Sequence, residues 1–344
     1  MESQSENHED PLSRQDVIYF FLVTVCTIGS IAVGFRLYSK IFPDSEKYLL
    51  LVDWFHGQIS TSELIAPWSY RPLTSFLASL VPLDPVLSFL MVNTILLLLL
   101  NYIIYLICRE FRFSKLSSFL VTSIYTFSHP SVGYGVAVLV EAGSMLSIAL
   151  IAYVLLQKPD QKHRLYILLL LVMGVCFRET VIVMAGAYLF YTRDWKTFIP
   201  LFIISGSVYL LNRTIFNPGV SDTGYFWSFH LNNFILTGSN TIRMVILAFQ
   251  FIIPFMVIGL YVLRNRTHER KTVLNWLITI GVPLSGITIF GLFFASFTSR
   301  FIWPLYISFI PLVGKGVEGF IDFFRGIIMG LKLKDDEMQT ISET

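Results

Sequence analysis

The sequence predicts an all-α fold, a polytopic transmembrane helical bundle of about ten spans, and three observations predict it. Hydrophobic residues make up 54% of the chain and charged residues only 14%, a balance far from that of soluble domains. Three apolar runs are long enough to cross about 30 Å of hydrocarbon as helices without help, namely Val86–Cys108, Ile242–Leu263 and Val273–Phe294. Basic residues collect in short connectors between the apolar runs, as they do in the cytoplasmic loops of membrane proteins.

The two ends of the chain differ from the apolar body between them. Residues 1–16 are polar and acidic, the wrong chemistry for the positively charged start of a signal peptide, so we expect an uncleaved polar tail. Val17–Phe35 is then the first span. Residues 326–344 are too polar to pack, and we expect a second polar tail there. Residues 17–325 form the predicted transmembrane domain.

Six further apolar runs complete the predicted helices, and some of them are too short to cross the bilayer unaided. They are Leu116–Ser128, Val136–Leu156, Leu165–Phe177, Thr180–Tyr191, Phe198–Phe216 and Phe301–Phe324.

The stretch Leu165–Tyr191 is either one long helix or two short paired helices that meet at Arg178 and Glu179. A single crossing would place the very basic Arg264–Lys271 connector outside, whereas a hairpin places all five basic connectors on the cytoplasmic side. We therefore predict a hairpin. The basic connectors contain Arg109/Arg112/Lys115, Lys158/Lys162/Arg164, Arg193/Lys196, Arg264/Arg266/Arg270/Lys271 and Arg325/Lys332/Lys334.

This topology places the remaining segments on the extracytoplasmic face, including a long first loop that carries short interfacial helices. These segments are Arg36–Pro85, His129–Gly135, the turn at Arg178 and Glu179, Asn217–Thr241 and Ser296–Arg300. Charged groups beside hydrocarbon are costly unless they are paired or reach water, so they are candidates for a functional site. The candidates on this face are Asp53, Arg71, Glu141, Arg178, Glu179 and Arg300. Scattered structural ion pairs would have no reason to share one side.

The first loop supplies a carboxylate and a guanidinium. Asp53 in LVDWFHGQ follows a hydrophobic lead-in, where a partly desolvated carboxylate serves as a general base or orients a metal ion or hydroxyl. A helix cap at the membrane interface is the structural alternative. Arg71 precedes Pro72, which disfavours helix at Arg71, and its planar fork of donors suits a phosphate. The alternative is an arginine that reaches lipid headgroups.

Histidines and acidic residues on the same face raise the question of a metal. His56, His129 and His230 lie in outside segments, and with Asp53 or Glu141 they are the candidate ligands of a divalent cation. Their spacing matches no metal-binding signature, so we expect no cofactor. Glu141 also begins an apolar run, where the helix dipole alone would favour a carboxylate. The net charge of +2 gives no reason to expect a nucleic-acid partner.

These residues together resemble the GT-C superfamily of integral membrane glycosyltransferases, which use polyprenyl-phosphate-linked sugars. The likeness covers most of residues 17–325 and rests on short motifs. They are Asp53 followed by Tyr70-Arg71-Pro72-Leu73, Glu141 in VLVEAGSML, Arg178-Glu179-Thr180, and Arg300 before Pro304 and Pro311. The chain departs from the family in the paired acidic motif of the first loop, because Trp54 follows Asp53.

The resemblance implies an inverting transfer of a sugar from a polyprenyl-phosphate donor to a glycan, lipid or protein acceptor at the extracytoplasmic face. Asp53 is the expected base, and Glu141 and Glu179 are the other candidate catalytic residues. An arginine would neutralise the departing lipid phosphate. The expected substrate-binding residues are Arg71, Tyr70, Arg178, Arg300, His56 and His129.

Two other classes of membrane protein remain as alternatives. A transporter or lipid flippase often shows repeat symmetry and polar residues at the midplane, and neither is evident here. A structural or assembly protein gives no reason for Asp53, Arg71 and Arg300 to converge.

Overall fold

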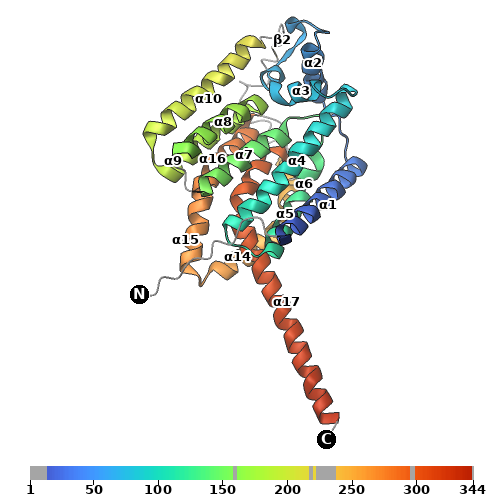
Figure 1. Cartoon of the computed structure of the whole chain (residues 1–344), viewed down its shortest axis with the longest axis vertical. Coiled ribbons are helices and arrows are strands. Elements are labelled where there is room, and N and C mark those ends of the chain that lie inside the picture. The colour runs from blue at the N-terminus through green and yellow to red at the C-terminus, as the bar shows by residue number, and fades with distance from the viewer. Residues whose placement is uncertain (1–13, 158–160, 217–219, 222–237, 295–298, 343–344) are drawn as a thin grey trace.

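The computed structural model describes residues 14–157, 161–216, 220–221, 238–294 and 299–342. Nearly all of these residues are helical, and Figure 1 shows the helices packed into one bundle. Two strands of two residues each, Ile65–Ala66 (β1) and Val220–Ser221 (β2), pair in parallel with Ile65 beside Val220. The predicted all-α class is confirmed.

The elements of the first half pack around one long helix. They are α1 (Arg14–Leu37), α2 (Ser45–Phe55), η1 (Thr61–Glu63), η2 (Trp68–Tyr70), α3 (Pro72–Ser79), α4 (Pro85–Glu110), α5 (Lys115–Thr126), α6 (His129–Tyr134) and α7 (Glu141–Leu156). Helix α4 contacts α1, α3, α5 and α7 and is the centre of this half.

Helix α4 also positions the start of α7. It begins where the Asp84 carboxylate accepts a hydrogen bond from the Val86 amide at 3.0 Å, a typical N-cap. Further along, the buried Asn93 amide donates to the carbonyls of Ala137 and Leu139 at 2.6 and 2.8 Å. These bonds satisfy irregular backbone just before α7, which buried irregular segments require.

The second half begins with the hairpin and ends with a long helix. Its elements are α8 (Gln161–Phe177), η3 (Glu179–Ile182), α9 (Val183–Thr192), α10 (Trp195–Ile215), α13 (Gly238–Phe249), α14 (Ile253–Leu263), α15 (Thr267–Trp276), η4 (Leu277–Gly281), α16 (Val282–Phe294), η5 (Ser299–Phe301), η6 (Trp303–Leu305) and α17 (Tyr306–Ser342). Helices α14 and α17 touch backbone to backbone, since a Cβ at Gly316 would collide with the Phe255 carbonyl.

The predicted reversal of the chain between α8 and α9 is present. Arg178 is extended, with φ −162° and ψ 131°, and separates α8 from η3. At the far ends of the two helices, Arg164 and Asp194 form an ion pair at 3.5 Å, so the chain after α9 has returned to the start of α8. Near the turn, a Cβ at Gly174 would stand only 2.5 Å from the Val181 side chain, so this close approach requires glycine.

Among the described residues, fewer helices have the length and composition to span a membrane than the sequence predicted. Four helices of the described residues are long and apolar enough to cross a membrane, namely Gln15–Leu37, Pro85–Glu110, Trp195–Ile215 and Thr267–Ile289. A fifth span arises if the bent pair Ile242–Phe249 and Ile253–Leu263, with an angle of 65°, counts as one. The prediction of about ten spans is not confirmed, because helices such as α7 and α9 are apolar but short. These helices nevertheless indicate an integral membrane protein.

The basic connectors gather at one end of the bundle, which we call the basic end. Side chains of Phe111 after α4, Arg193 after α9 and Thr272 on α15 line one pocket there. Lys315 on α17 pairs with Glu269 on α15 at 2.9 Å. Helix α4 has 26 residues and spans about 39 Å, so its start lies far from the basic end. That opposite end, which carries α2 and α3 (Figure 1), is the loop end, and the ion pair of Arg71 with Glu179 places η3 there too.

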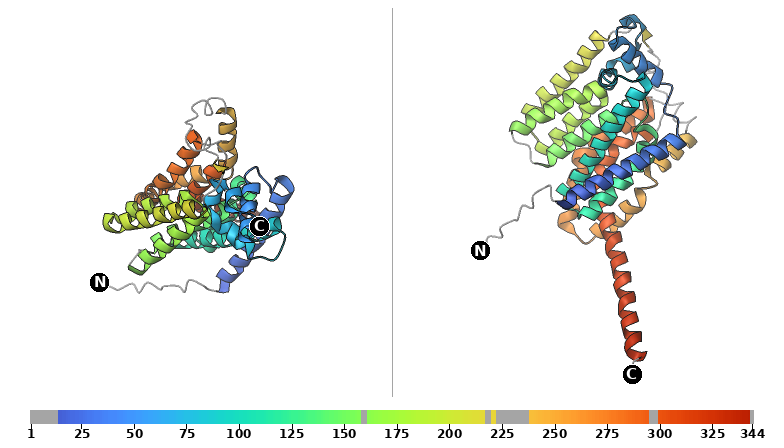
Figure 2. Two further views of the ribbon diagram at one scale, coloured as in Figure 1. Left: turned by 90° about the horizontal axis from the view of Figure 1, so that it is seen from above. Right: turned by 45° about the vertical axis from the view of Figure 1, so that its right-hand side comes forward.

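Helices extend into both of the expected polar tails. Helix α1 begins at Arg14, and Asp16, expected in a polar tail, is buried within 3.3 Å of Lys115 and 3.0 Å of the Tyr105 hydroxyl. Residues 326–342 continue α17 as a helix, which projects from the body in Figure 1 and in the right-hand view of Figure 2. Residues 1–13 and 343–344 of the expected tails lie outside the described residues.

The two ends of the bundle predict a labelling pattern. Gln58→Cys lies at the loop end and Asn265→Cys at the basic end, and both positions are exposed. Because basic connectors stay in the cytoplasm, a membrane-impermeant maleimide should label Gln58→Cys on intact cells and Asn265→Cys only after permeabilisation. The parent chain, with its own three cysteines, sets the background. Labelling of Asn265→Cys on intact cells would contradict the orientation.

Candidate functional site

Six charged side chains from five segments meet at the loop end and form what we call the charge cluster. Its members are Asp44, Arg71, Glu141, Arg178, Glu179 and Arg300. The three guanidinium groups and three carboxylates balance to a formal charge of zero. Balance of this kind is what partly dry surroundings demand, since a buried charge without a counter-ion is strongly destabilising.

Arg71 joins the first loop to the tip of the hairpin. Its Nε and Nη2 donate to the two carboxylate oxygens of Glu179 at 2.7 and 2.6 Å, a two-pronged pairing. Its Nη1 donates to the Tyr48 hydroxyl at 3.0 Å. The backbone at Arg71 is non-helical before Pro72, as the sequence predicted. Burial raises the pKa of Tyr48 to about 12, so this phenol stays protonated at neutral pH.

Glu141 holds two arginines with one carboxylate oxygen. Its Oε1 lies 3.1 Å from Arg178 Nη1 and 3.5 Å from Arg300 Nη1, and its side chain is 3% exposed. Its Oε2 has no hydrogen-bond partner among the described residues. The Phe301 ring lies 5.4 and 5.5 Å from the guanidinium carbons of Arg178 and Arg300. Two cations therefore share one buried carboxylate against an aromatic wall.

Asp44 completes the cluster, and sequence reasoning missed it. Its Oδ2 accepts a hydrogen bond from Arg300 Nη1 at 3.1 Å, and its side chain is 18% exposed. It stands directly before α2 yet makes no capping bond with its side chain. In sequence, an Asp before an acidic first turn looks like an ordinary N-cap. The missing signal was the arginine partner, which lies 256 positions away.

Asp53, the expected base, stands apart from the charge cluster. It follows Tyr48 by five residues on α2, which puts it about 140° around the helix from the buried Tyr48. The buried face of α2 contains Tyr48, Leu51 and Val52, whereas Asp53 is partly exposed. Within the described part of the chain, its carboxylate takes part in no hydrogen bond or ion pair. The structure brings together the other five predicted charges and replaces Asp53 by Asp44.

The other predicted substrate contacts lie around the cluster with partners of their own. Tyr70 is buried, and Arg213 stacks 5.7 Å above its ring. His129 packs edge-on against Tyr38 at 5.5 Å, and burial lowers its pKa. His56 is exposed, with Nε2 3.0 Å from the Ser79 carbonyl oxygen. His230 lies outside the described residues.

The carboxylates of the cluster face arginines rather than one another. Among the residues that the structure describes, no group of three or more His, Cys, Asp or Glu side chains is arranged to hold a metal ion. The expected absence of a cofactor stays a prediction.

The arrangement favours anion binding beside Arg178 and Arg300. Arg71 donates two hydrogen bonds to both carboxylate oxygens of Glu179, whereas Arg178 and Arg300 share Glu141. Asp44 is more exposed than Glu141, so a ligand from solvent would reach these two arginines beside Asp44. An incoming phosphate would meet two guanidinium groups close together there and would share them with Glu141 and Asp44.

No protein-family model and no curated protein matches the chain. What remains to indicate a function is the geometry of the charge cluster and the resemblance in sequence.

The fork between Arg71 and Glu179 predicts a non-additive effect on stability. Arg71→Ala leaves Glu179 without its counter-ion and should lower the free energy of unfolding by about 3 kcal/mol. The double variant Arg71→Ala with Glu179→Gln removes the stranded charge and should regain part of that loss. Thermal unfolding in detergent micelles measures both variants and Glu179→Gln alone. A double variant that is less stable by the sum of the single changes would show that the two residues do not interact.

Proposed function

We propose that this protein is a membrane glycosyltransferase, which moves a sugar from a polyprenyl-phosphate donor to an acceptor with inversion at the anomeric carbon. The observation that carries the proposal is the meeting of Arg178, Arg300 and Asp44 at the loop end. A lipid phosphate needs cations at the membrane edge, and an acceptor hydroxyl needs a carboxylate beside them. The positive-inside rule supports an extracytoplasmic position for the loop end.

The charge cluster supplies both halves of the transfer. The acceptor oxygen gives its proton to a carboxylate and bonds to the anomeric carbon, while the bond from that carbon to the phosphate oxygen breaks. The leaving polyprenyl phosphate takes the electron pair. Arg178 and Arg300 stabilise the charge that develops on its oxygens, in surroundings that burial makes poor in water.

We assign the role of base to Asp44 rather than to Asp53. Glu179 has both oxygens bound in the fork of Arg71, and the Glu141 side chain is 3% exposed. Asp44 is 18% exposed and uses Oδ2 for Arg300, and its Oδ1 makes no hydrogen bond within the described part of the chain. That oxygen is the one available to a hydroxyl.

The position of the cluster distinguishes this proposal from its main alternative. A transporter or lipid flippase requires polar groups near the bilayer midplane. The six charges of the cluster instead lie at the loop end, beside the first loop and the hairpin tip. The exposed apolar faces of helices such as α4 and α10 leave room for a polyprenyl tail within the membrane.

The activity itself is tested with the full chain reconstituted in lipid vesicles. Radiolabelled polyprenyl-phosphate sugars are added, and both the loss of donor and the release of polyprenyl phosphate are followed. Turnover of at least one donor is the expected result. Movement of intact donor across the bilayer without cleavage would favour the flippase.

Matched asparagine variants identify the base. Asp44→Asn keeps the shape of the side chain and its bond with Arg300 but removes the proton acceptor, so transfer should fall by about two to four orders of magnitude. Asp53→Asn should transfer at close to the wild-type rate. Donor binding is measured alongside as a control and should persist in both variants. Loss of transfer in Asp53→Asn with activity kept in Asp44→Asn would return the role to Asp53.

A further inference from the structure

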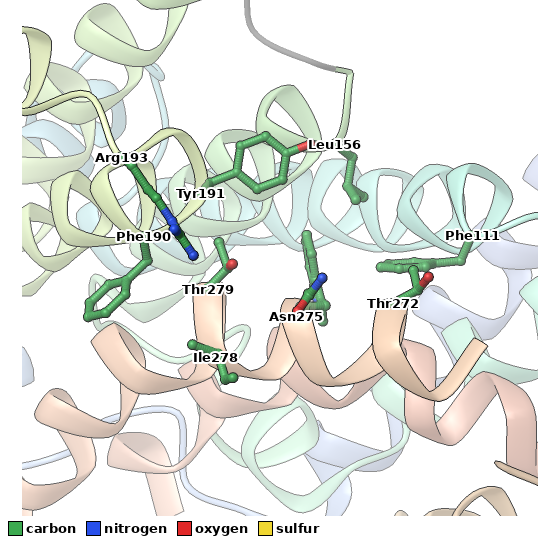
Figure 3. Close-up of a pocket in the computed structure, with 10 residues that line it drawn as sticks. Phe111, Leu156, Phe190, Tyr191, Arg193, Thr272, Asn275, Ile278 and Thr279 are labelled. Atoms are coloured by element: carbon green, nitrogen blue, oxygen red, sulfur yellow. The ribbon is translucent and has the colours of Figure 1, made fainter. Parts of the chain in front are cut away.

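A pocket of about 420 Å³, drawn in Figure 3, lies between α9 and α15. It is at the basic end, at the opposite end of the bundle from the charge cluster. One wall is the end of α9, with Phe190, Tyr191 and Arg193. The facing wall is the continuous helix α15–η4, on which Thr279 lies near Arg193 and Thr272 lies beside Phe111, with Asn275 between them. The pocket thus lies between two elements that the proposed reaction does not use.

The backbone at Arg193 directs its side chain to the pocket. Arg193 follows α9 in a left-handed conformation, with φ 57° and ψ 22°, a position that usually holds glycine. A residue with a Cβ is less stable than glycine in this conformation, so the need to end the helix does not explain why the residue is an arginine. Figure 3 shows its guanidinium extending toward Thr279.

The pocket has a cation but no anion. None of its lining residues is acidic, and among the described residues no carboxylate pairs with Arg193. The adjacent Asp194 is engaged elsewhere, with Arg164 at 3.5 Å and the Thr197 hydroxyl at 2.6 Å. The pocket therefore carries a formal charge of +1 that the protein does not neutralise.

The helix opposite Arg193 offers uncharged polar groups. Thr272, Asn275 and Thr279 follow at spacings of three and four, which puts them on one helical face. Thr279 lies in the π-helical turn Leu277–Gly281, and such turns recur at functional sites. Within the described residues, the side chains of Asn275 and Thr279 have no hydrogen-bond partner. They are available to the ester and hydroxyl oxygens of a ligand.

Apolar surface borders the same pocket. Phe190 and Ile278 line it and are 48% and 44% exposed, and Trp276 forms part of its wall. Both α9 and the α15–α16 helix belong to the apolar bundle, and Thr267–Ile289 is a candidate span. A ligand with a polar head at Arg193 would therefore lay its tail on membrane-facing side chains. Such a ligand is an amphiphile with a phosphate.

We propose that this pocket binds the headgroup of an anionic glycerophospholipid. Arg193 pairs with the phosphate, Asn275 and Thr279 contact the headgroup oxygens, and the acyl chains lie against Phe190 and Ile278. A net negative headgroup is preferred, because no lining carboxylate would receive a choline or ammonium group. This site is independent of the proposed transferase activity.

Two matched glycine variants test the proposal. Arg112 is also left-handed, with φ 61°, also exposed and also at the basic end, but it does not line the pocket. Glycine suits both backbones, so Arg193→Gly and Arg112→Gly should fold equally well in lipid-free detergent. Native mass spectrometry of the detergent-purified full chain measures binding of dioctanoyl phosphatidylglycerol. Arg193→Gly should bind about tenfold more weakly or worse, and Arg112→Gly as the wild type.

Two further probes separate the possible ligands on the wild-type chain. Dioctanoyl phosphatidylcholine should bind more weakly than dioctanoyl phosphatidylglycerol. Glycerol 3-phosphate, which has no acyl chains, should bind more weakly than either lipid. Equal binding of the two lipids would overturn the preference for an anionic headgroup. If glycerol 3-phosphate bound as tightly as dioctanoyl phosphatidylglycerol, the membrane would be overturned as the source of the bound phosphate. Equal affinities of Arg193→Gly and Arg112→Gly would overturn the site itself.

Discussion

The two-pronged pairing of Arg71 with Glu179 connects the first loop to the hairpin tip, and the rest of the loop end is arranged around it. The two residues are 108 positions apart, and their contact brings η2, α3 and η3 into one surface. Since Arg178 precedes Glu179, the same turn delivers a second guanidinium to Glu141. Glu141 in turn receives Arg300, which reaches Asp44. Each step follows from the requirement that a poorly hydrated charge has a counter-ion.

The helices beneath the cluster hold it through a few buried polar contacts. Asn93 binds the backbone before α7 and so fixes where Glu141 begins its helix. Deeper in the bundle, the Asn101 amide donates to the Thr27 hydroxyl at 2.9 Å and ties α4 to α1. Hydrogen bonds of this kind supply the specificity that apolar packing within a bilayer lacks.

The two ends of the bundle differ in how their charges are balanced. At the loop end, six charges sum to zero, so an anion would have to share arginines that already have carboxylates. At the basic end, Arg193 faces a pocket without a carboxylate, so a phosphate would meet a full positive charge. Shared arginines suit a ligand that arrives and leaves during turnover, whereas an unshared one suits a lipid that stays bound.

Local chemistry along the chain was enough to predict several features. Apolar composition indicated a helical membrane protein, and the run of basic connectors indicated the hairpin that Arg164 and Asp194 close. The break at Arg178 and the non-helical backbone before Pro72 were also visible in the sequence. These features depend on residue type and near neighbours, which a sequence displays directly.

Only the tertiary structure decided which carboxylates take part in the cluster. Asp44 and Asp53 both lie in the first loop, and choosing between them requires knowing which face of α2 packs inward. It also requires knowing that Asp44 is a partner of Arg300, which is 256 positions away along the chain. Asp16 was misjudged for the same reason, because its ion pair with Lys115 forms only when α1 meets α5. A sequence determines which charges need partners, but packing between distant helices determines which partners they find.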